Sequence, residues 1–247
     1  MFRDRRGVSE TVGFVFVFSL VLLTVGTVFT IGYAGLQDAR DAERINNAER
    51  AFDVLDDNIE DITVRGAPSR GTEVRLAEAS IGTGESTLLS VSGYEGGSLA
   101  FSTGNYTLDP VVYESGDTRI RYSGNALTRI QPAGSVALSE PDFVLSERRA
   151  IIPVVELSVE DRSIAGSRTV LIRSQRRLRT VEVDDTDVDR LEIALSSPVA
   201  DRWESYLSGA GMSCSRPGGA DDPRVVCETT DLDRVQVVHF ELAVTFG

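Results

Sequence analysis

The pattern of apolar and polar residues first marks out a long uncharged segment near the N-terminus. From Thr11 to Gln37 no residue is charged and none is His, and Val, Phe and Leu predominate. A helix of this length reaches about 40 Å, more than the roughly 30 Å hydrocarbon layer of a bilayer. Because only a helix satisfies its own backbone in lipid, the segment predicts a transmembrane helix.

The charges on either side of this segment predict its orientation. Three of the first seven residues are Arg, whereas acidic residues follow from Asp38 onward. Positive residues favour the cytoplasmic side, so we expect a cytoplasmic N-terminus and an extracellular domain after about residue 38. A cleaved secretory signal has a shorter apolar region, of roughly 7–15 residues, and fits less well than a permanent signal anchor.

The helical period continues beyond the apolar segment. Residues 38–62 contain neither Gly nor Pro. Apolar residues recur there at intervals of three or four: Ile45, Ala48, Phe52, Leu55, Ile59 and Ile62. We therefore expect one helix from about Val8 to Ile62, membrane-embedded over 8–37 and amphipathic over 38–62. The apolar stripe should pack on the domain that follows, and a coiled coil with another copy is the alternative.

A turn-rich linker over residues 63–72 separates the helix from a segment in which apolar and polar residues alternate, a period of two residues. Short strand patterns divided by Gly run through residues 73–247, with a hairpin over 111–122. Longer strands are expected at 152–159, 168–172, 179–183, 191–195 and 235–246. One short helix is expected near 198–208, after Ser197 and Pro198. The fold class is therefore α+β, with the long helix packed on an antiparallel β-sandwich-like domain.

The amino-acid composition indicates the partners and the salt environment that suit this protein. All 25 basic residues are Arg, and 38 acidic residues bring the net charge of the 247-residue chain to −13. This charge argues against nucleic acid as a partner. An acid excess without Lys is expected of a protein from a high-salt environment, whereas a GC-rich genome would explain only the missing Lys.

Residues that carry enzymatic or metal chemistry are sparse. The chain has one His and two Cys, and it contains no nucleophile-elbow or zinc-protease motif. We therefore expect no enzymatic activity, no metal and no cofactor. Cys214 and Cys227 should form a disulfide that closes a loop, and a metal site with His239 is the alternative. Strand alternation places His239 on the face of Val237 and Glu241, half exposed.

Three polar segments of the β-rich part are expected at its surface. Asn105 begins the N-x-S/T acceptor for glycosylation, between two strand patterns. The basic residues over 173–179 are expected at a solvated hairpin tip, and a contact with an acidic patch on a neighbouring subunit is the alternative. The carboxylates over 184–189 are expected in an acidic turn, since they lack the glycine and closing glutamate of a calcium loop.

The residues just before the apolar segment resemble a known signal. Arg5-Arg6-Gly7 followed by Val8-Ser9-Glu10 is similar to the class III signal of archaeal type IV pilins, and of their haloarchaeal members in particular. In that family a membrane-embedded prepilin peptidase cuts after the Gly, and the apolar helix stays on the mature protein. The resemblance implies that residues 1–7 are a leader, that the cut falls between Gly7 and Val8, and that Glu10 becomes third. Bacterial pilins carry their Glu at the fifth position, so this chain departs from their spacing.

The resemblance implies a function as well as a processing site. We expect a non-catalytic type IV pilin-like or minor-pilin subunit of the cell surface, with the fold of a pilin subunit. Its partners would be membrane lipid, a prepilin peptidase-like enzyme and other pilin subunits in a filament. The alternative is an uncleaved single-pass membrane anchor that carries an extracellular binding module.

Overall fold

The computed structural model describes residues 6–146, 148–159 and 163–247. The chain forms two compact units, Met1–Asn46 and Asn47–Gly247. The first unit is entirely helical over its described residues, and the second combines the end of the same helix with two β-sheets. The fold is therefore α+β, as the sequence predicts.

Helix α1 spans Arg6–Thr63, within two residues of the predicted bounds at both ends. No proline interrupts it, because the first Pro of the chain is Pro68. At its end Val64 donates its N–H to Glu60 O at 2.8 Å, and Gly66 adopts a φ of +80°. This left-handed conformation suits glycine and turns the chain out of the helix.

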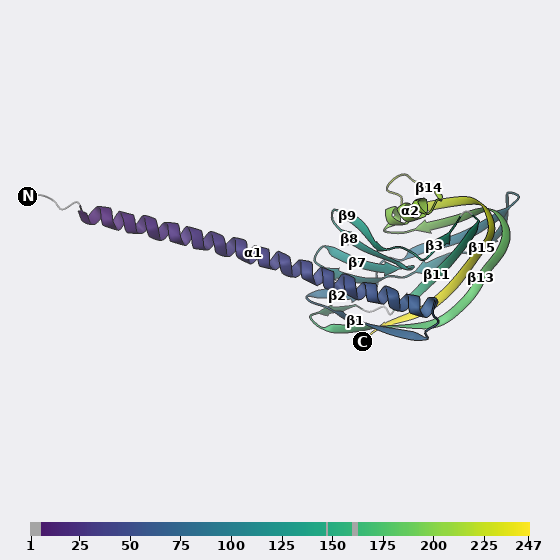
Figure 1. Ribbon diagram of the computed structural model, residues 1–247, viewed down its shortest axis with the longest axis horizontal. Coiled ribbons are helices and arrows are strands. Elements are labelled where there is room, and N and C mark those ends of the chain that lie inside the picture. The colour runs from purple at the N-terminus through teal and green to yellow at the C-terminus, as the bar shows by residue number, and fades with distance from the viewer. Residues whose placement is uncertain (1–5, 147, 160–162) are drawn as a thin grey trace, which may run out of the picture. The chain divides into compact units, whose positions relative to one another are not determined.

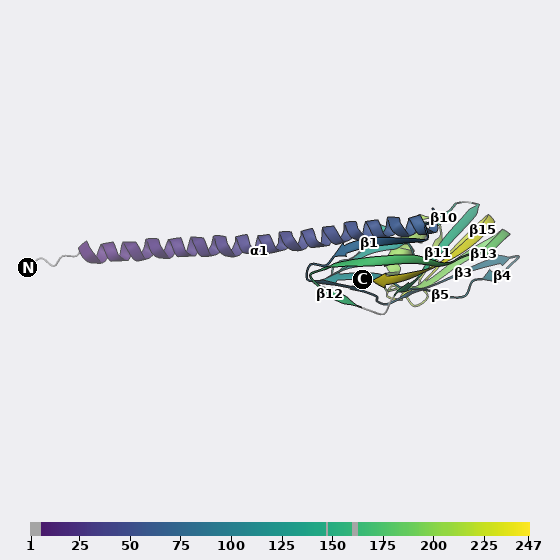
Figure 2. The same cartoon turned by 90° about the horizontal axis from the view of Figure 1, so that it is seen from below.

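The last turns of α1 bury the predicted apolar stripe within the second unit. Ala48, Phe52, Leu55, Ile59 and Ile62 are each at most 2 % exposed. The helix contacts both sheets, because the rings of Phe52 and of Tyr113 in the smaller sheet make a T-shaped contact and Asn58 donates to Thr72 Oγ1 of the larger sheet at 2.9 Å. The last turns of α1 run beside β1 of the larger sheet (Figure 2). The prediction that the stripe packs on its own domain is confirmed.

Fifteen strands follow α1 in the described residues. They are β1 (Ser69–Arg75), β2 (Ala79–Gly82), β3 (Thr87–Glu95), β4 (Ser98–Ser102), β5 (Tyr106–Leu108), β6 (Val111–Ser115), β7 (Thr118–Ser123), β8 (Ala126–Gln131), β9 (Gly134–Ser139), β10 (Val144–Leu145), β11 (Arg149–Val159), β12 (Ile164–Gly166), β13 (Thr169–Ser196), β14 (Ser213–Ser215) and β15 (Arg224–Phe246). The larger sheet has the order β10-β11-β15-β13-β3-β4. Three further strands join it, because β1 pairs with β13, β5 pairs with β3 and β14 pairs with β15. The smaller sheet has the order β12-β2-β6-β7-β8-β9 (Figure 1).

The continuity of β13 shows that three predictions are wrong. The strands expected at 168–172, 179–183 and 191–195 form one continuous strand, so 173–179 is not a hairpin tip and 184–189 is not a turn. β15 pairs with β13 from Ile172 to Ser196 and supplies backbone hydrogen bonds throughout this polar stretch. Two bulges, at Arg176/Leu178 and Val181/Val183, let the long strand bend. Tertiary pairing thus overrides the local turn signal.

The larger sheet is also not purely antiparallel. β11 and β15 run parallel, from Arg149 opposite Arg234 to Val159 opposite Val244. Parallel neighbours need a long connection, and here β12, β13, a helix and β14 separate the two strands in the chain. The other strand pairs of the described residues are antiparallel, including the predicted hairpin of β6 and β7.

The predicted short helix is present as α2 (Ala200–Gly209). Trp203 is 4 % exposed and Leu207 is fully buried, so the apolar side faces the core as its spacing predicts. Ser135 of β9 donates to Asp201 of α2 at 3.3 Å. α2 therefore links the smaller sheet to the core of the larger one, which contains residues of β3, β11, β13 and β15.

Candidate functional site

The exposed apolar surface of α1 is the largest candidate site. Every side chain described between Thr11 and Gln37 is exposed. The segment is strongly apolar, and none of its most apolar residues is buried. Among the described residues this is the one helix long and apolar enough to cross a membrane. An apolar surface of this size marks a site for lipid or for another protein.

Three threonine hydroxyls in this segment are hydrogen-bonded inside the helix. Thr24 donates to Leu20 O at 3.0 Å, and Thr27 donates to Leu23 O at 2.8 Å. Thr30 likewise donates to the carbonyl of Gly26. An unpaired hydroxyl is costly in hydrocarbon, whereas a bond to the preceding turn removes that cost. These three hydroxyl groups are therefore compatible with lipid.

The apolar surface ends at an aromatic and polar border. The rings of Phe29 and Tyr33 lie 6.2 Å apart, and Gln37 Nε2 donates to Tyr33 Oη at 3.0 Å. One turn further, Arg44 pairs with Asp41 at 3.1 Å. Tyrosine followed by charged residues is typical of the boundary between a bilayer and water.

The residues of the predicted processing site lie at the start of α1. The helical backbone includes Gly7 and Val8, but residues 1–5 and the side chains of residues 6–10, Glu10 among them, lie outside the described part of the chain. Cleavage between Gly7 and Val8 therefore stays a prediction.

The two cysteines are joined to each other. Cys214 of β14 lies opposite Cys227 of β15, and their sulfur atoms form a disulfide. The predicted pairing is confirmed, and neither sulfur is available as a thiolate for the alternative metal site. The bond closes the loop between β14 and β15, where Arg216 also pairs with Glu204 of α2 at 2.7 Å.

Asn105 lies where a glycosylation enzyme could reach it. It is exposed in the short loop between β4 and β5, and Thr107 of the same acceptor is exposed as well. Tyr106 between them is buried. The structure thus brings the acceptor to the surface, and glycosylation itself stays a prediction.

His239 is a buried member of a polar cluster that the sequence did not reveal, in which two partly exposed glutamates contact its ring. The residue is only 9 % exposed, so the prediction of a half-exposed His is wrong. Its Nε2 lies 2.9 Å from Glu156 Oε2. Its Nδ1 lies 3.1 Å from Glu182 Oε1, close enough for an ion pair but without the geometry of a hydrogen bond. Tyr106 donates its hydroxyl to the same Glu182.

The cluster joins four strands of the larger sheet, namely β5, β11, β13 and β15. Glu156 of β11 also accepts the backbone N–H of Thr107 of β5 at 2.7 Å, in addition to its contact with His239 of β15. Glu182 of β13 accepts the hydroxyl of Tyr106 of β5. Burial raises the pKa of Tyr106 well above its usual range, and the hydrogen bond to Glu182 adds to this rise. These groups are common in acid–base chemistry, but here their polar atoms bond mainly to one another. Glu156, Glu182 and His239 lie on β11, β13 and β15. Only the register of these strands shows that the three residues meet.

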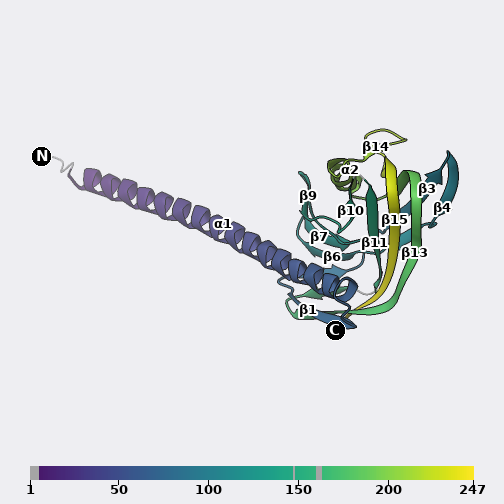
Figure 3. The ribbon, with the colours of Figure 1, turned by 45° about the vertical axis from the view of Figure 1, so that its right-hand side comes forward.

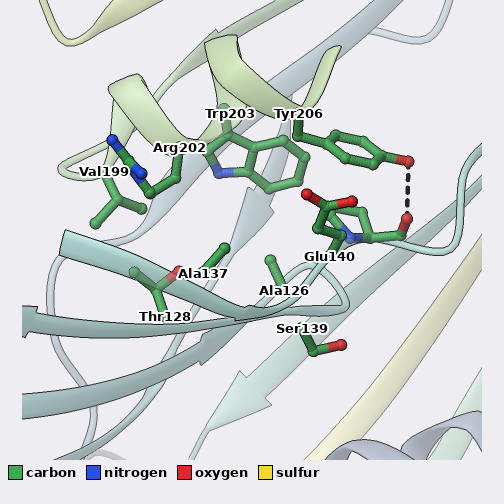
Figure 4. Close-up of a pocket in the computed structure, with 10 residues that line it drawn as sticks. Ala126, Thr128, Ala137, Ser139, Glu140, Val199, Arg202, Trp203 and Tyr206 are labelled. Atoms are coloured by element: carbon green, nitrogen blue, oxygen red, sulfur yellow. Dashed lines mark hydrogen bonds between the residues drawn. The ribbon is translucent and has the colours of Figure 1, made fainter. Parts of the chain in front are cut away.

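A small hollow lies between α2 and the smaller sheet (Figure 4). Trp203 and Tyr206 line it from α2, and Ala126 and Ala137 line it from β8 and β9. Tyr206 donates to Pro141 O at 2.7 Å, and burial raises its pKa to about 12. The hollow holds about 280 Å³, including space open to solvent. This is below the size of typical sites for drug-sized ligands.

These features define an α+β protein whose described residues contain one candidate membrane-spanning helix and a disulfide-bonded, β-rich domain. The chain belongs to a family of unknown function, DUF7289, whose sequence model matches residues 6–245. No curated protein and no solved structure matches the chain.

Proposed function

We propose that this protein is a non-catalytic, type IV pilin-like subunit of the cell surface. Its α1 helix holds it in the membrane or in a filament, and its β-rich domain is displayed outside the cell. The exposed, uncharged surface from Thr11 to Gln37 carries the proposal, since it needs lipid or neighbouring helices as its surroundings.

Two further observations support the proposal. The residues around Gly7 and Val8 resemble the archaeal pilin signal, and the helix continues without a break into a stripe buried by the β-rich domain. A continuous helix that is apolar at one end and packed on a β-rich domain at the other is the design of a type IV pilin subunit.

The proposed mechanism uses the same apolar surface twice. Before assembly, lipid covers residues 12–37 and keeps the subunit in the membrane. During assembly, neighbouring helices replace lipid around these residues, which requires no exposure of the apolar surface to water. A peptidase that cuts between Gly7 and Val8 would remove the basic leader and leave the helix intact.

The mass of the intact protein from membranes tests this function. We expect the native form to lack residues 1–7, and a Gly7→Val variant to keep them. Gly13→Val is the matched control, because a Cβ at Gly13 meets no atom within 4 Å, and it should mature normally.

Retention of residues 1–7 in the native membrane form would contradict pilin processing and favour the uncleaved anchor with a binding module. A native form that begins near Leu36 and is freely secreted would contradict both.

A further inference from the structure

The parallel pairing of β11 with β15 places two arginines side by side on one face of the larger sheet. β15 lies between β11 and β13 (Figure 3). The register sets Arg149 of β11 directly beside Arg234 of β15. Two positions further along, it sets Ile151 beside Gln236. Because directly opposite residues share a face and faces alternate along each strand, all four side chains lie on the same face.

This face is the outer one at this end of the sheet. The alternate residues of the same two strands are fully buried on the other face: Ala150, Ile152, Val235 and Val237. Arg149 and Arg234 are exposed. Together with Ile151 and Gln236 they line a hollow of about 370 Å³, including space open to solvent. A water molecule occupies about 30 Å³ in the liquid, so the hollow has room for a small ion and several waters.

The charges around the hollow do not balance. Like charges directly opposite each other in a sheet are destabilising. Arg234 is neutralised within the chain, because its Nε and Nη2 donate to the two carboxylate oxygens of Asp184, each at 2.7 Å. The ion pairs of the described residues do not include Arg149. Two guanidinium groups and one carboxylate leave a single positive charge at the hollow.

Both arginines are positioned before any ligand arrives. Ser146 Oγ accepts the backbone N–H of Arg149 at 3.2 Å, and the N–H of Ser146 donates to Arg149 O at 2.9 Å. These bonds fix the backbone at the start of β11. Asp184 holds the guanidinium of Arg234 by two of its five N–H donors, so three donors remain for another acceptor. A guanidinium fork matches the oxygens of a carboxylate or a phosphate.

We propose that this hollow binds an oxyanionic group with one negative charge, a carboxylate or a phosphodiester. Arg149 and Arg234 donate charge-assisted hydrogen bonds to its oxygens, and the amide of Gln236 supplies a further donor. The bound charge balances the positive charge of the site. This inference goes beyond the function proposed above and does not depend on it, because the site lies within the β-rich domain and requires neither cleavage of the leader nor a filament.

Saturation-transfer NMR of the full-length protein in an uncharged detergent tests the site. Acetate is the carboxylate probe and dimethyl phosphate is the phosphodiester probe, since both are monoanions with methyl protons. Irradiation of the aromatic protein signals leaves the detergent unexcited, and low, constant ionic strength keeps exposed charges from being screened. We expect saturation to reach the methyl protons of at least one probe. The probe with the larger signal identifies the group that the site binds.

Arg149→Gln distinguishes the site from a general attraction of anions. It removes one of the two guanidinium groups and should lower the signal of the bound probe at least about threefold. Arg148→Gln is the matched control, because Arg148 pairs with Asp233 at 3.2 Å and lies outside the lining of the hollow. The control removes the same charge one residue away and should keep the signal of the unmodified protein. Thermal melting checks that each variant is folded.

Three results would overturn the proposal. These are the absence of saturation transfer to both probes, an unchanged signal in Arg149→Gln, and an equal loss of signal in Arg149→Gln and Arg148→Gln. The last result would show that anions respond only to the net charge of this region.

Discussion

At the scale of single residues, the strands on either side decide the environment of a side chain. Alternation along β15 correctly groups His239 with Val237 and Glu241. Its burial arises because Val154 of β11 and Thr180 of β13 lie directly beside it. Glu156 and Glu182 reach the ring from those same neighbouring strands. A pattern within one strand contains no information about such neighbours, so the cluster could not be predicted.

Asp56 on α1 gives a prediction at this scale. Burial raises its pKa from 3.8 to about 6, with smaller contributions from Asp142 and Asp57, while hydrogen bonds from Ser139 and Tyr122 act in the opposite direction. The folded state therefore binds this proton more tightly than the unfolded state. Its contribution to stability is complete below about pH 4 and is lost as the pH rises to about 6. Asp56→Asn should remove this loss and raise the free energy of unfolding at pH 7 by about 1–2 kcal/mol.

Urea unfolding followed by the fluorescence of Trp203, the single tryptophan, measures this effect. The difference between Asp56→Asn and the unmodified protein should grow between pH 4 and pH 6. Asp117→Asn, in the exposed turn between β6 and β7, is the control and should show no such growth. A difference for Asp56→Asn that is constant with pH would contradict the assignment.

At the scale of elements, the helices and the β6–β7 hairpin could be predicted, whereas the pairing of strands distant in the chain could not. The bounds of α1 and α2 follow from local apolar spacing and from the residues that end a helix. β13 could not be recognised as one strand, because its polar middle segment has no strand pattern of its own. That segment is a strand through its pairing with β15. β8 and β9 were missed for the same reason, since their mixed polar and apolar residues make a strand only beside β7.

The disulfide between β14 and β15 gives a prediction at this scale. Replacing both Cys214 and Cys227 by Ala should lower the free energy of unfolding by about 2–4 kcal/mol, because the unfolded chain loses its cross-link. Alanine is chosen because Cys227 is fully buried and a serine hydroxyl there would add its own cost. Urea unfolding measures the change, and the unmodified protein in reductant should show a similar loss. Equal stability with and without the bond would show that it contributes little.

At the scale of the whole molecule, the proposed role of the apolar half of α1 as a membrane span gives a prediction. Leu23, near the middle of the segment, is 69 % exposed. Leu23→Arg places a charge at the centre of the predicted span, which disfavours insertion by about 2.5–3.5 kcal/mol. We expect this variant to shift from the carbonate-resistant membrane fraction to the soluble or degraded fraction.

Val54→Arg is the matched control, since Val54 is 50 % exposed on the other half of the same helix. This variant should remain in the membrane fraction to the same extent as the unmodified protein. Equal partitioning of the two variants would contradict a spanning role for the segment.

The sequence by itself determined the features that depend on neighbours along the chain. These are the uncharged span, the extent of α1 with its buried stripe, the position of α2 and the pairing of the only two cysteines. The tertiary structure alone decided the parallel pairing of β11 with β15, the burial of His239 and the continuity of β13. The physical reason is that helices satisfy their backbone locally, whereas each strand depends on hydrogen bonds to segments that are distant in the chain.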